Sequence, residues 1–169
     1  PDFTLTDQHG EVVSLSALQG SPVALAFIFT TCPDVCPAIA AQFRAAWDEL
    51  APELQKSVRF LGVTVDPETD TSDVLLAFGK RFELEETGVW HGLRGSRAEL
   101  ETVWQAYGID VAGIDAEVGA HQGETHGQAT IRHTDAIYLI DPQGKQRVFL
   151  RSSADPADLA SDLSALSTE

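Results

Sequence analysis

Two cysteines, Cys32 and Cys36, are the residues whose type and spacing most clearly indicate chemistry in this sequence. They are the only cysteines of the chain, and three residues separate them in the segment Thr-Cys-Pro-Asp-Val-Cys-Pro. A framework of structural disulfides would use more cysteines at longer separations. A close pair with no others therefore indicates either a redox couple or two sulfur ligands for a metal ion.

The spacing of the pair is compatible with both chemistries. Thioredoxin-type redox pairs are usually Cys-x-x-Cys, one residue shorter than the spacing found here. Residues four apart on a helix share a face, with Cβ atoms about 5–6 Å apart, and a disulfide needs about 3.5–4.5 Å. The two sulfurs could therefore form a disulfide after a small backbone shift, or converge on one metal ion.

The donor set favours copper among the metals that bind thiolates. Two soft sulfurs select Cu(I), zinc or an iron–sulfur cluster. Structural zinc normally takes four ligands and a cluster takes four cysteines, which this chain does not contain. Cu(I) accepts a low coordination number, so two sulfurs and one imidazole suffice. The chain also contains no methionine, so thioether ligands are not available to it.

His133 is the candidate for the third ligand among five histidines. It immediately precedes a predicted buried strand, at the sheet edge that faces the cysteine turn in a thioredoxin-like topology. Alone, such a residue would usually be structural, and the cysteine pair makes it a candidate ligand. His121 and His126 lie in a glycine-rich stretch and are alternatives, whereas His9 and His91 are expected to be structural.

The elements predicted around Cys32 and Cys36 place them at a reactive edge. The apolar run over 22–29 predicts a buried strand, and apolar residues three and four apart over 39–50 predict a helix. The pair thus lies in a strand-to-helix turn, at the edge where open α/β folds place their sites. We expect the helix N-terminus to lower the pKa of the thiols.

The remaining patterns predict one thioredoxin-like α/β domain over residues 1–169. Ser96 and Glu99 form a capping box, Asp155-Pro156 starts a last helix, and Asp70 is a plausible N-cap. The fold would have three layers, an N-terminal β-hairpin extension and a long aperiodic loop before His133. The segments read as strands are 3–5, 12–15, 58–65, 89–93, 136–140 and 146–151, and the further helices are 71–81, 96–107 and one from 156.

Charge argues against a nucleic-acid partner, and hydropathy argues against a membrane-spanning segment within this sequence. The chain has 26 acidic and 11 basic residues, a net charge of −15, which repels nucleic acid and chiefly serves solubility. It has no run of 18 apolar residues that would span a bilayer. Because it opens at Pro1, we expect a signal peptide or membrane anchor to be missing from this sequence.

Three blocks of the sequence together resemble the Sco/SenC family of copper proteins. They are Phe27–Pro37 with its Cys-Pro-Asp-Val-Cys-Pro core, Val63–Thr71 with its Asp-Pro-Glu-Thr-Asp core, and His133–Gly144. The resemblance covers nearly the whole chain. It implies copper, as Cu(I), Cu(II) or both, bound by Cys32, Cys36 and His133.

The resemblance also implies a cellular role. It predicts a metallochaperone that delivers copper to the dinuclear site of cytochrome c oxidase subunit II, with another copper carrier or a thioredoxin-like reductant as a further partner. The domain would be extracytoplasmic, in the bacterial periplasm or at the outer face of the cell membrane, and tethered by its missing N-terminus. Asp66 and Asp34 would lie near the metal.

Other functions share the same residues. A thiol–disulfide oxidoreductase that reduces the cysteines of the oxidase copper site would use Cys32 and Cys36 as its redox-active residues. The stretch 132–135 lacks the proline that thioredoxin-type reductases place there, which favours metal binding over enzymatic exchange. A peroxiredoxin would have Thr three residues before its reactive cysteine, where this chain has Phe29. The sequence does not bear on a heme- or copper-responsive signalling role.

Overall fold

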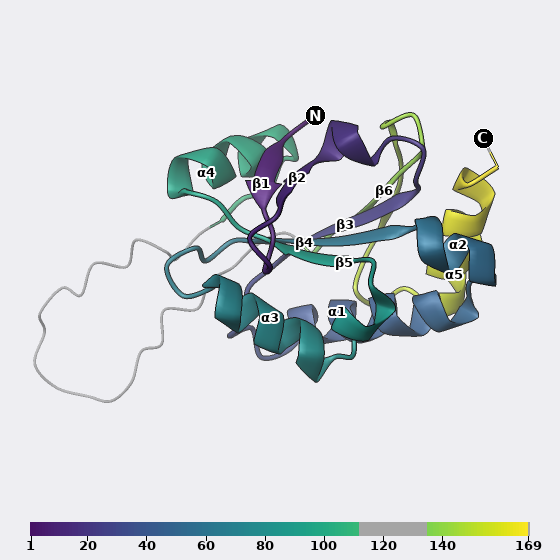
Figure 1. Ribbon diagram of the computed structural model, residues 1–169, viewed down its shortest axis with the longest axis horizontal. Helices are drawn as coiled ribbons and strands as arrows, with labels where there is room; N and C mark the ends of the chain where they lie inside the picture. Colours follow the sequence, from purple (N-terminus) through teal and green to yellow (C-terminus); the bar gives the residue numbers. More distant parts are fainter. Residues whose placement is uncertain (112–134, 169) are drawn as a thin grey trace, which may run out of the picture.

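A five-stranded mixed sheet forms the centre of the protein in a computed structural model, which describes residues 1–111 and 135–168 (Figure 1). The strands lie in the order β5-β4-β3-β6-β7. β3, β4 and β5 are parallel, and β6 and β7 are antiparallel to their neighbours. Their bounds are β3 Val23–Ile28, β4 Arg59–Thr64, β5 Trp90–Leu93, β6 Ile137–Ile140 and β7 Gln146–Leu150.

The apolar runs of the sequence become the inner strands. Every residue of β3 and β6 is buried, as are five of the six residues of β4. A strand covered on both faces needs apolar side chains at every position, which explains why these runs do not alternate with polar residues. In the edge strand β7 no residue is fully buried, and Phe149 on it is 47% exposed.

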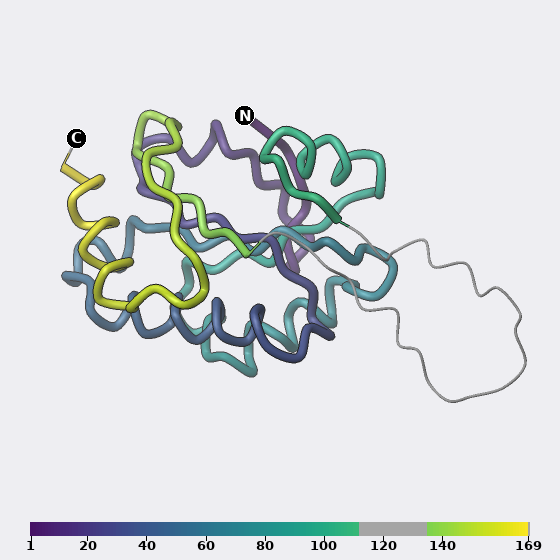
Figure 2. Tube along the Cα trace, turned by 180° about the vertical axis from the view of Figure 1, so that it is seen from behind, coloured from purple at the N-terminus to yellow at the C-terminus, as the bar shows by residue number. Residues whose placement is uncertain are grey.

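Helices cover both faces of the sheet, as the sequence predicts. α1 (Val35–Glu49), α3 (Ser72–Arg81) and α5 (Pro156–Leu166) lie on one face (Figures 1 and 2). α4 (Arg97–Ala106) lies on the other face with the antiparallel hairpin of β1 (Thr4–Thr6) and β2 (Val12–Ser14). Short elements missing from the sequence prediction are α2 (Pro52–Ser57) and the 3₁₀ helices η1 (Leu15–Leu18) and η2 (Glu85–Thr87).

The helix starts confirm two of the three predicted caps. Ser96 and Glu99 form the complete capping box of α4, and Asp155 accepts the N–H of Ala157 at the start of α5. The prediction for Asp70 is wrong, because Thr71 caps α3 and accepts a hydrogen bond from the N–H of Val74. The Asp70 side chain is instead fully buried in the interior of the fold.

Two polar contacts join the N-terminal hairpin to β5 and to η2. His91 Nδ1 lies 3.0 Å from the Asp7 carboxylate, and His9 Nε2 lies 2.9 Å from Glu85. Both histidines are thus structural, as expected. Burial alone would raise the pKa of Asp7, but hydrogen bonds from His91, Glu11 and His9 outweigh it and hold that pKa below its usual range.

The contact between Asp7 and His91 predicts how acid affects the stability of the fold. Ionised Asp7 stabilises the fold above its unfolded pKa of about 3.8, and that contribution is lost as pH falls through the lower folded pKa. In Asp7→Asn, the free energy of unfolding should fall by about 1–3 kcal/mol at pH 6. The difference from the parent protein, measured by urea unfolding, should shrink below about pH 4. A difference that stays constant from pH 6 to pH 3 would contradict this role.

Candidate metal centre

Cys32 lies between β3 and α1, and Cys36 lies at the start of α1. The N–H of Cys32 donates to the carbonyl of Phe29 at 3.2 Å, which closes a turn directly after β3. α1 begins at Val35, so Cys36 lies in its first turn whereas Cys32 precedes the helix. The helical i, i+4 geometry predicted for the pair is therefore wrong in detail, because the turn rather than the helix places the first sulfur. Residues 29–36 are called the cysteine turn below.

Each sulfur of the cysteine turn faces a backbone N–H. The N–H of Cys36 points at Cys32 Sγ at 3.4 Å, and the N–H of Phe29 points at Cys36 Sγ at 3.5 Å. The two cysteines are not joined by a disulfide. Backbone donors stabilise negative charge on sulfur, which is the charge that a metal-bound or nucleophilic sulfur carries. Each of the two sulfurs in the cysteine turn is thus supported by a backbone N–H donor of its own.

The two thiols differ in their exposure. Cys32 is partly exposed, whereas Cys36 is completely buried. Burial raises the pKa of the Cys36 thiol far above its usual range, the Phe29 N–H opposes this rise, and Cys32 and Asp70 add to it. The predicted lowering of the thiol pKa by the helix N-terminus is therefore wrong for Cys36, because desolvation outweighs the favourable backbone dipoles.

A buried carboxylate lies behind the cysteine turn. Asp70 accepts hydrogen bonds from the N–H and hydroxyl of Thr30 and from the hydroxyl of Thr64. Thr64 in turn accepts the N–H of Asp66 at 2.9 Å. Burial raises the pKa of Asp70, and the hydrogen bonds from Thr30 and Thr64 oppose the rise. These residues were not among the predicted site residues, apart from Asp66; the polar Thr30 between an apolar strand and Cys32 was the available signal.

Asp66 and Asp34 occupy different environments. Asp66 follows β4 at the same sheet edge as the cysteine turn, where the N–H of Val65 donates to the Ile28 carbonyl at 2.8 Å. Asp34 is exposed at the N-cap position of α1, and its side chain makes no capping bond among the described residues. The carbonyl of Asp34 accepts the N–H of Ala38 at 3.2 Å. Asp66 is therefore better placed than Asp34 to act on a buried charge at this edge.

The chain enters β6 at this same edge. β6 is antiparallel to β3, with Ile137 opposite Ala26, so Asp135 and Ala136 lie toward the carboxyl end of β3. Asp135 is held there by the backbone N–H and hydroxyl of Ser152, at 3.0 and 2.9 Å. His121, His126 and His133 lie outside the described residues. Within residues 1–111 and 135–168, no three His, Cys, Asp or Glu side chains gather as a metal site.

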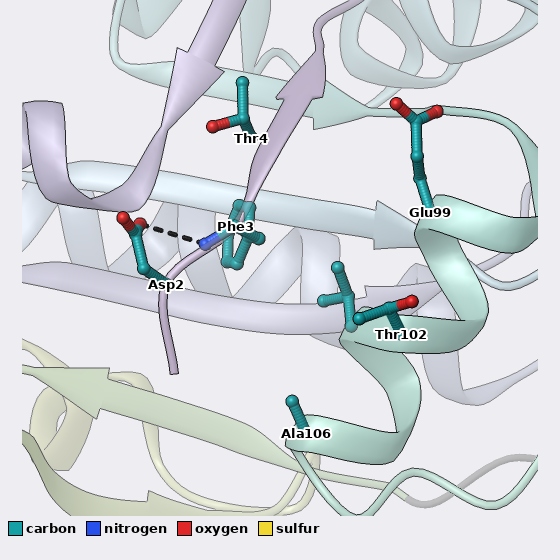
Figure 3. A pocket seen from close by; sticks show the side chains of 7 residues that line it. Asp2, Phe3, Thr4, Glu99, Thr102 and Ala106 are labelled. Carbon is teal, nitrogen blue, oxygen red and sulfur yellow. Dashed lines mark hydrogen bonds between the residues drawn. The ribbon is translucent and has the colours of Figure 1, made fainter.

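A separate cavity of about 240 Å³ lies beside α4, away from the cysteine turn. Figure 3 shows the Asp2 carboxylate at its rim, accepting the Phe3 N–H at 2.9 Å. Its lining contains neither cysteine nor histidine, so it offers no soft metal ligand. The residues that line it are Asp2, Phe3, Thr4, Glu99, Thr102, Val103 and Ala106.

Comparison with known proteins agrees with this fold. The structure of Bradyrhizobium japonicum ScoI with copper bound matches with a TM-score of 0.80 and 28% identity, over 98% of both chains. A SCO1/SenC family lipoprotein from Bacillus anthracis matches with a TM-score of 0.77 and 26% identity, over 98% of this chain and 93% of the other. BsSco, a member of the Sco family of cytochrome c oxidase assembly proteins with a disulfide switch, matches with a TM-score of 0.73 and 27% identity, over 99% and 92%.

The thioredoxin-like fold predicted from the sequence is confirmed by these structures. Among the described residues, no helix is both long enough and apolar enough to cross a membrane. The sequence model of the SCO1/SenC family matches residues 1–168, essentially the whole chain. This chain belongs to the SCO1/SenC family.

Proposed function

We propose that this protein binds copper through Cys32, Cys36 and His133 and delivers it to the dinuclear copper site of cytochrome c oxidase subunit II. The observation that carries the proposal is the cysteine turn, in which two sulfurs at one sheet edge each face a backbone N–H. A relative of the same fold holds copper, and another belongs to a family of oxidase assembly proteins.

The donor set of the cysteine turn fits copper better than harder metals. Thiolate sulfur prefers Cu(I) to cations that favour oxygen ligands. Cys36 is enclosed by apolar side chains, which limits water at one side of the pair. Bound copper would supply a cation that stabilises both sulfurs as thiolates, and the thiol protons would leave to solvent on binding.

The unequal exposure of the cysteines suggests how the cargo is passed on. Cys36 is buried and would act as the retaining ligand. Cys32 is partly exposed, so a ligand of the recipient protein could approach the metal from its side. His133 precedes Asp135 by two residues in the sequence, and Asp135 lies at the edge where β3 ends. The imidazole of His133 would then complete the proposed set of ligands with the two sulfurs.

The proposed location follows from the same role. We place the domain outside the cytoplasm, in the periplasm or at the outer face of the cell membrane, with a tether outside this sequence. A relative from Bacillus anthracis is a lipoprotein, which supports a tether of this kind. The other partners we propose are a copper carrier or a thioredoxin-like reductant that keeps Cys32 and Cys36 reduced.

Thiol–disulfide exchange is the second candidate function, and the exposure of Cys32 supports it. An exposed attacking thiol beside a buried resolving thiol is the arrangement needed to form and then release a mixed disulfide. A relative contains a disulfide switch. In this role Cys32 would attack a disulfide of the recipient, and Cys36 would displace the recipient thiol. The pair would end oxidised and the recipient reduced.

Copper titration tests the first proposal. Reduced Cys32→Ser, Cys36→Ser and His133→Ala should each bind Cu(I) at least about 100-fold more weakly than the parent, a greater loss than removal of an outer partner of a ligand causes. The two Ser variants should also lose or shift the thiolate-to-Cu(II) absorption band. His9→Ala is the matched control, since His9 lies in the turn of the N-terminal hairpin and contacts Glu85 of η2. Parent-like copper affinity in His133→Ala would remove that residue from the site.

Trapping of mixed disulfides tests the second candidate. With an oxidised peptide carrying the two subunit II cysteines, Cys36→Ser should accumulate a mixed disulfide through Cys32, because the resolving thiol is gone. Cys32→Ser should form a mixed disulfide through Cys36 at least about tenfold more slowly, because buried thiols with a raised pKa are poor nucleophiles. Mass spectrometry of the quenched reaction measures both. Equal rates in the two variants would rule out Cys32 as the attacking thiol.

A further inference from the structure

We propose that Asp70 is a positioning residue whose buried carboxylate fixes the start of the cysteine turn and thereby the relative placement of Cys32 and Cys36. The inference rests on the proposed function, since it concerns the geometry of the same two sulfurs. It assigns Asp70 no bond to the metal. Asp70 acts through the backbone that leads to Cys32.

The first part of the argument is the set of donors that Asp70 holds. The Thr30 N–H lies 3.1 and 3.3 Å from the two carboxylate oxygens, and the Thr30 hydroxyl donates to Oδ1. The Thr64 hydroxyl donates to Oδ2 at 2.6 Å. Both carboxylate oxygens of Asp70 therefore accept hydrogen bonds. One of the two donor residues, Thr30, stands two positions before Cys32.

The second part is that the same carboxylate joins separate chain segments. Thr30 follows β3, Thr64 ends β4, and Asp70 itself stands just before α3. The Asp70 N–H also donates to the Asp66 carbonyl at 2.9 Å, and the Asp66 N–H donates to the Thr64 hydroxyl. These bonds join the ends of two neighbouring parallel strands to the turn over residues 66–70. The cysteine turn therefore starts from an anchored residue.

The third part is energetic. A fully buried carboxylate is costly unless hydrogen bonds replace its water, and here the replacing donors are one N–H and two hydroxyls. Capping of α3 does not explain the burial, because Thr71 performs that role. Asp66 carries like charge nearby and contributes to the raised pKa of Asp70. We attribute the burial of the Asp70 carboxylate, despite its desolvation cost and the like charge of Asp66, to its role in fixing the position of Thr30.

The step from Thr30 to the sulfurs is short. The Cys32 N–H is bonded to the Phe29 carbonyl, and the Cys36 N–H faces Cys32 Sγ. A shift of Thr30 therefore changes the position of Cys32 relative to Cys36, which is anchored in α1. Two sulfurs held close together gain effective concentration toward each other and toward one metal ion, and loss of the anchor should reduce both.

Thr64→Val and Thr64→Ser form the matched pair of variants that tests the proposal. Valine has nearly the shape of threonine without its hydroxyl, so Thr64→Val loses the donor to Asp70 and the acceptor of the Asp66 N–H at constant charge, while Thr64→Ser keeps both. Thr64→Val should bind Cu(I) at least about tenfold more weakly. In the metal-free protein its Cys32–Cys36 reduction potential should become less negative by about 30 mV, a tenfold change in the equilibrium constant. In Thr64→Ser, the Cu(I) affinity and the equilibrium constant of the Cys32–Cys36 disulfide should each stay within about twofold of the parent value. A factor of two corresponds to about 0.4 kcal/mol.

Asp141→Asn is the control for a loss of stability alone. Asp141 is also buried and accepts three hydrogen bonds, from Gln143, Lys145 and Arg147, but it follows Ile140, which pairs with Val23 at the opposite end of β3. Asp141→Asn should lower the unfolding midpoint without changing the potential or copper affinity. An equal change of potential in Asp141→Asn, or parent-like values in Thr64→Val, would overturn the positioning role. If Thr64→Val does not fold, Thr30→Val, which removes a hydroxyl at a partly exposed residue, is measured against the same outcomes.

The metal-free potential separates this inference from the proposed function. If copper affinity is unchanged when Cys32 and Cys36 are both replaced by Ser, the copper proposal fails. The positioning role of Asp70 is then decided by the potential of the thiol pair alone. A tenfold change in that equilibrium constant in Thr64→Val supports it, and its absence refutes it.

Discussion

The pairing of β3 on both of its sides is the constraint on which the candidate site depends. β3 is parallel to β4 and antiparallel to β6, with Ile28 opposite Thr64 and Ala26 opposite Ile137. The carboxyl ends of β3 and β4 and the amino end of β6 therefore share one edge of the sheet. Residues from the first quarter of the chain meet residues from its last third at this edge, and the cysteine turn begins there.

Burial at this edge sets the electrostatic character of the cysteine turn. The thiol of Cys36 and the carboxylate of Asp70 are both removed from water, and burial raises the pKa of each. Backbone N–H groups and threonine hydroxyls are the donors that compensate. A cation held by the sulfurs would favour the thiolate form that burial opposes. The site is thus suited to a soft cation more than to an unassisted thiolate.

Much of the fold was predictable because it is encoded in local patterns. Continuous apolar runs identified β3, β4 and β6, and the Ser96 capping box and the Asp155-Pro156 pair identified two helix starts. The short α2 lacked an apolar periodicity long enough to be recognised. These successes share a cause, since burial on both faces and helix capping each leave a signature within a few residues.

The sequence singles out Cys32 and Cys36 as a pair but does not predict their geometry. The spacing of Cys32 and Cys36 indicated a shared chemistry, but nothing local shows that the helix starts only at Val35 or that Cys36 is completely desolvated. The sequence predicts Asp70 as a helix cap, because its actual partners, Thr30 and Thr64, are distant in sequence or belong to other elements. Interactions of this kind depend on tertiary contacts that one segment does not reveal.

X-ray absorption at the copper edge tests the central claim most directly. The reduced protein, loaded with one equivalent of Cu(I), should show a first shell of two sulfurs and one imidazole nitrogen. The same measurement on His133→Ala should lose the nitrogen and keep both sulfurs. A first shell without sulfur, or one identical in His133→Ala and the parent, would contradict a site built from Cys32, Cys36 and His133.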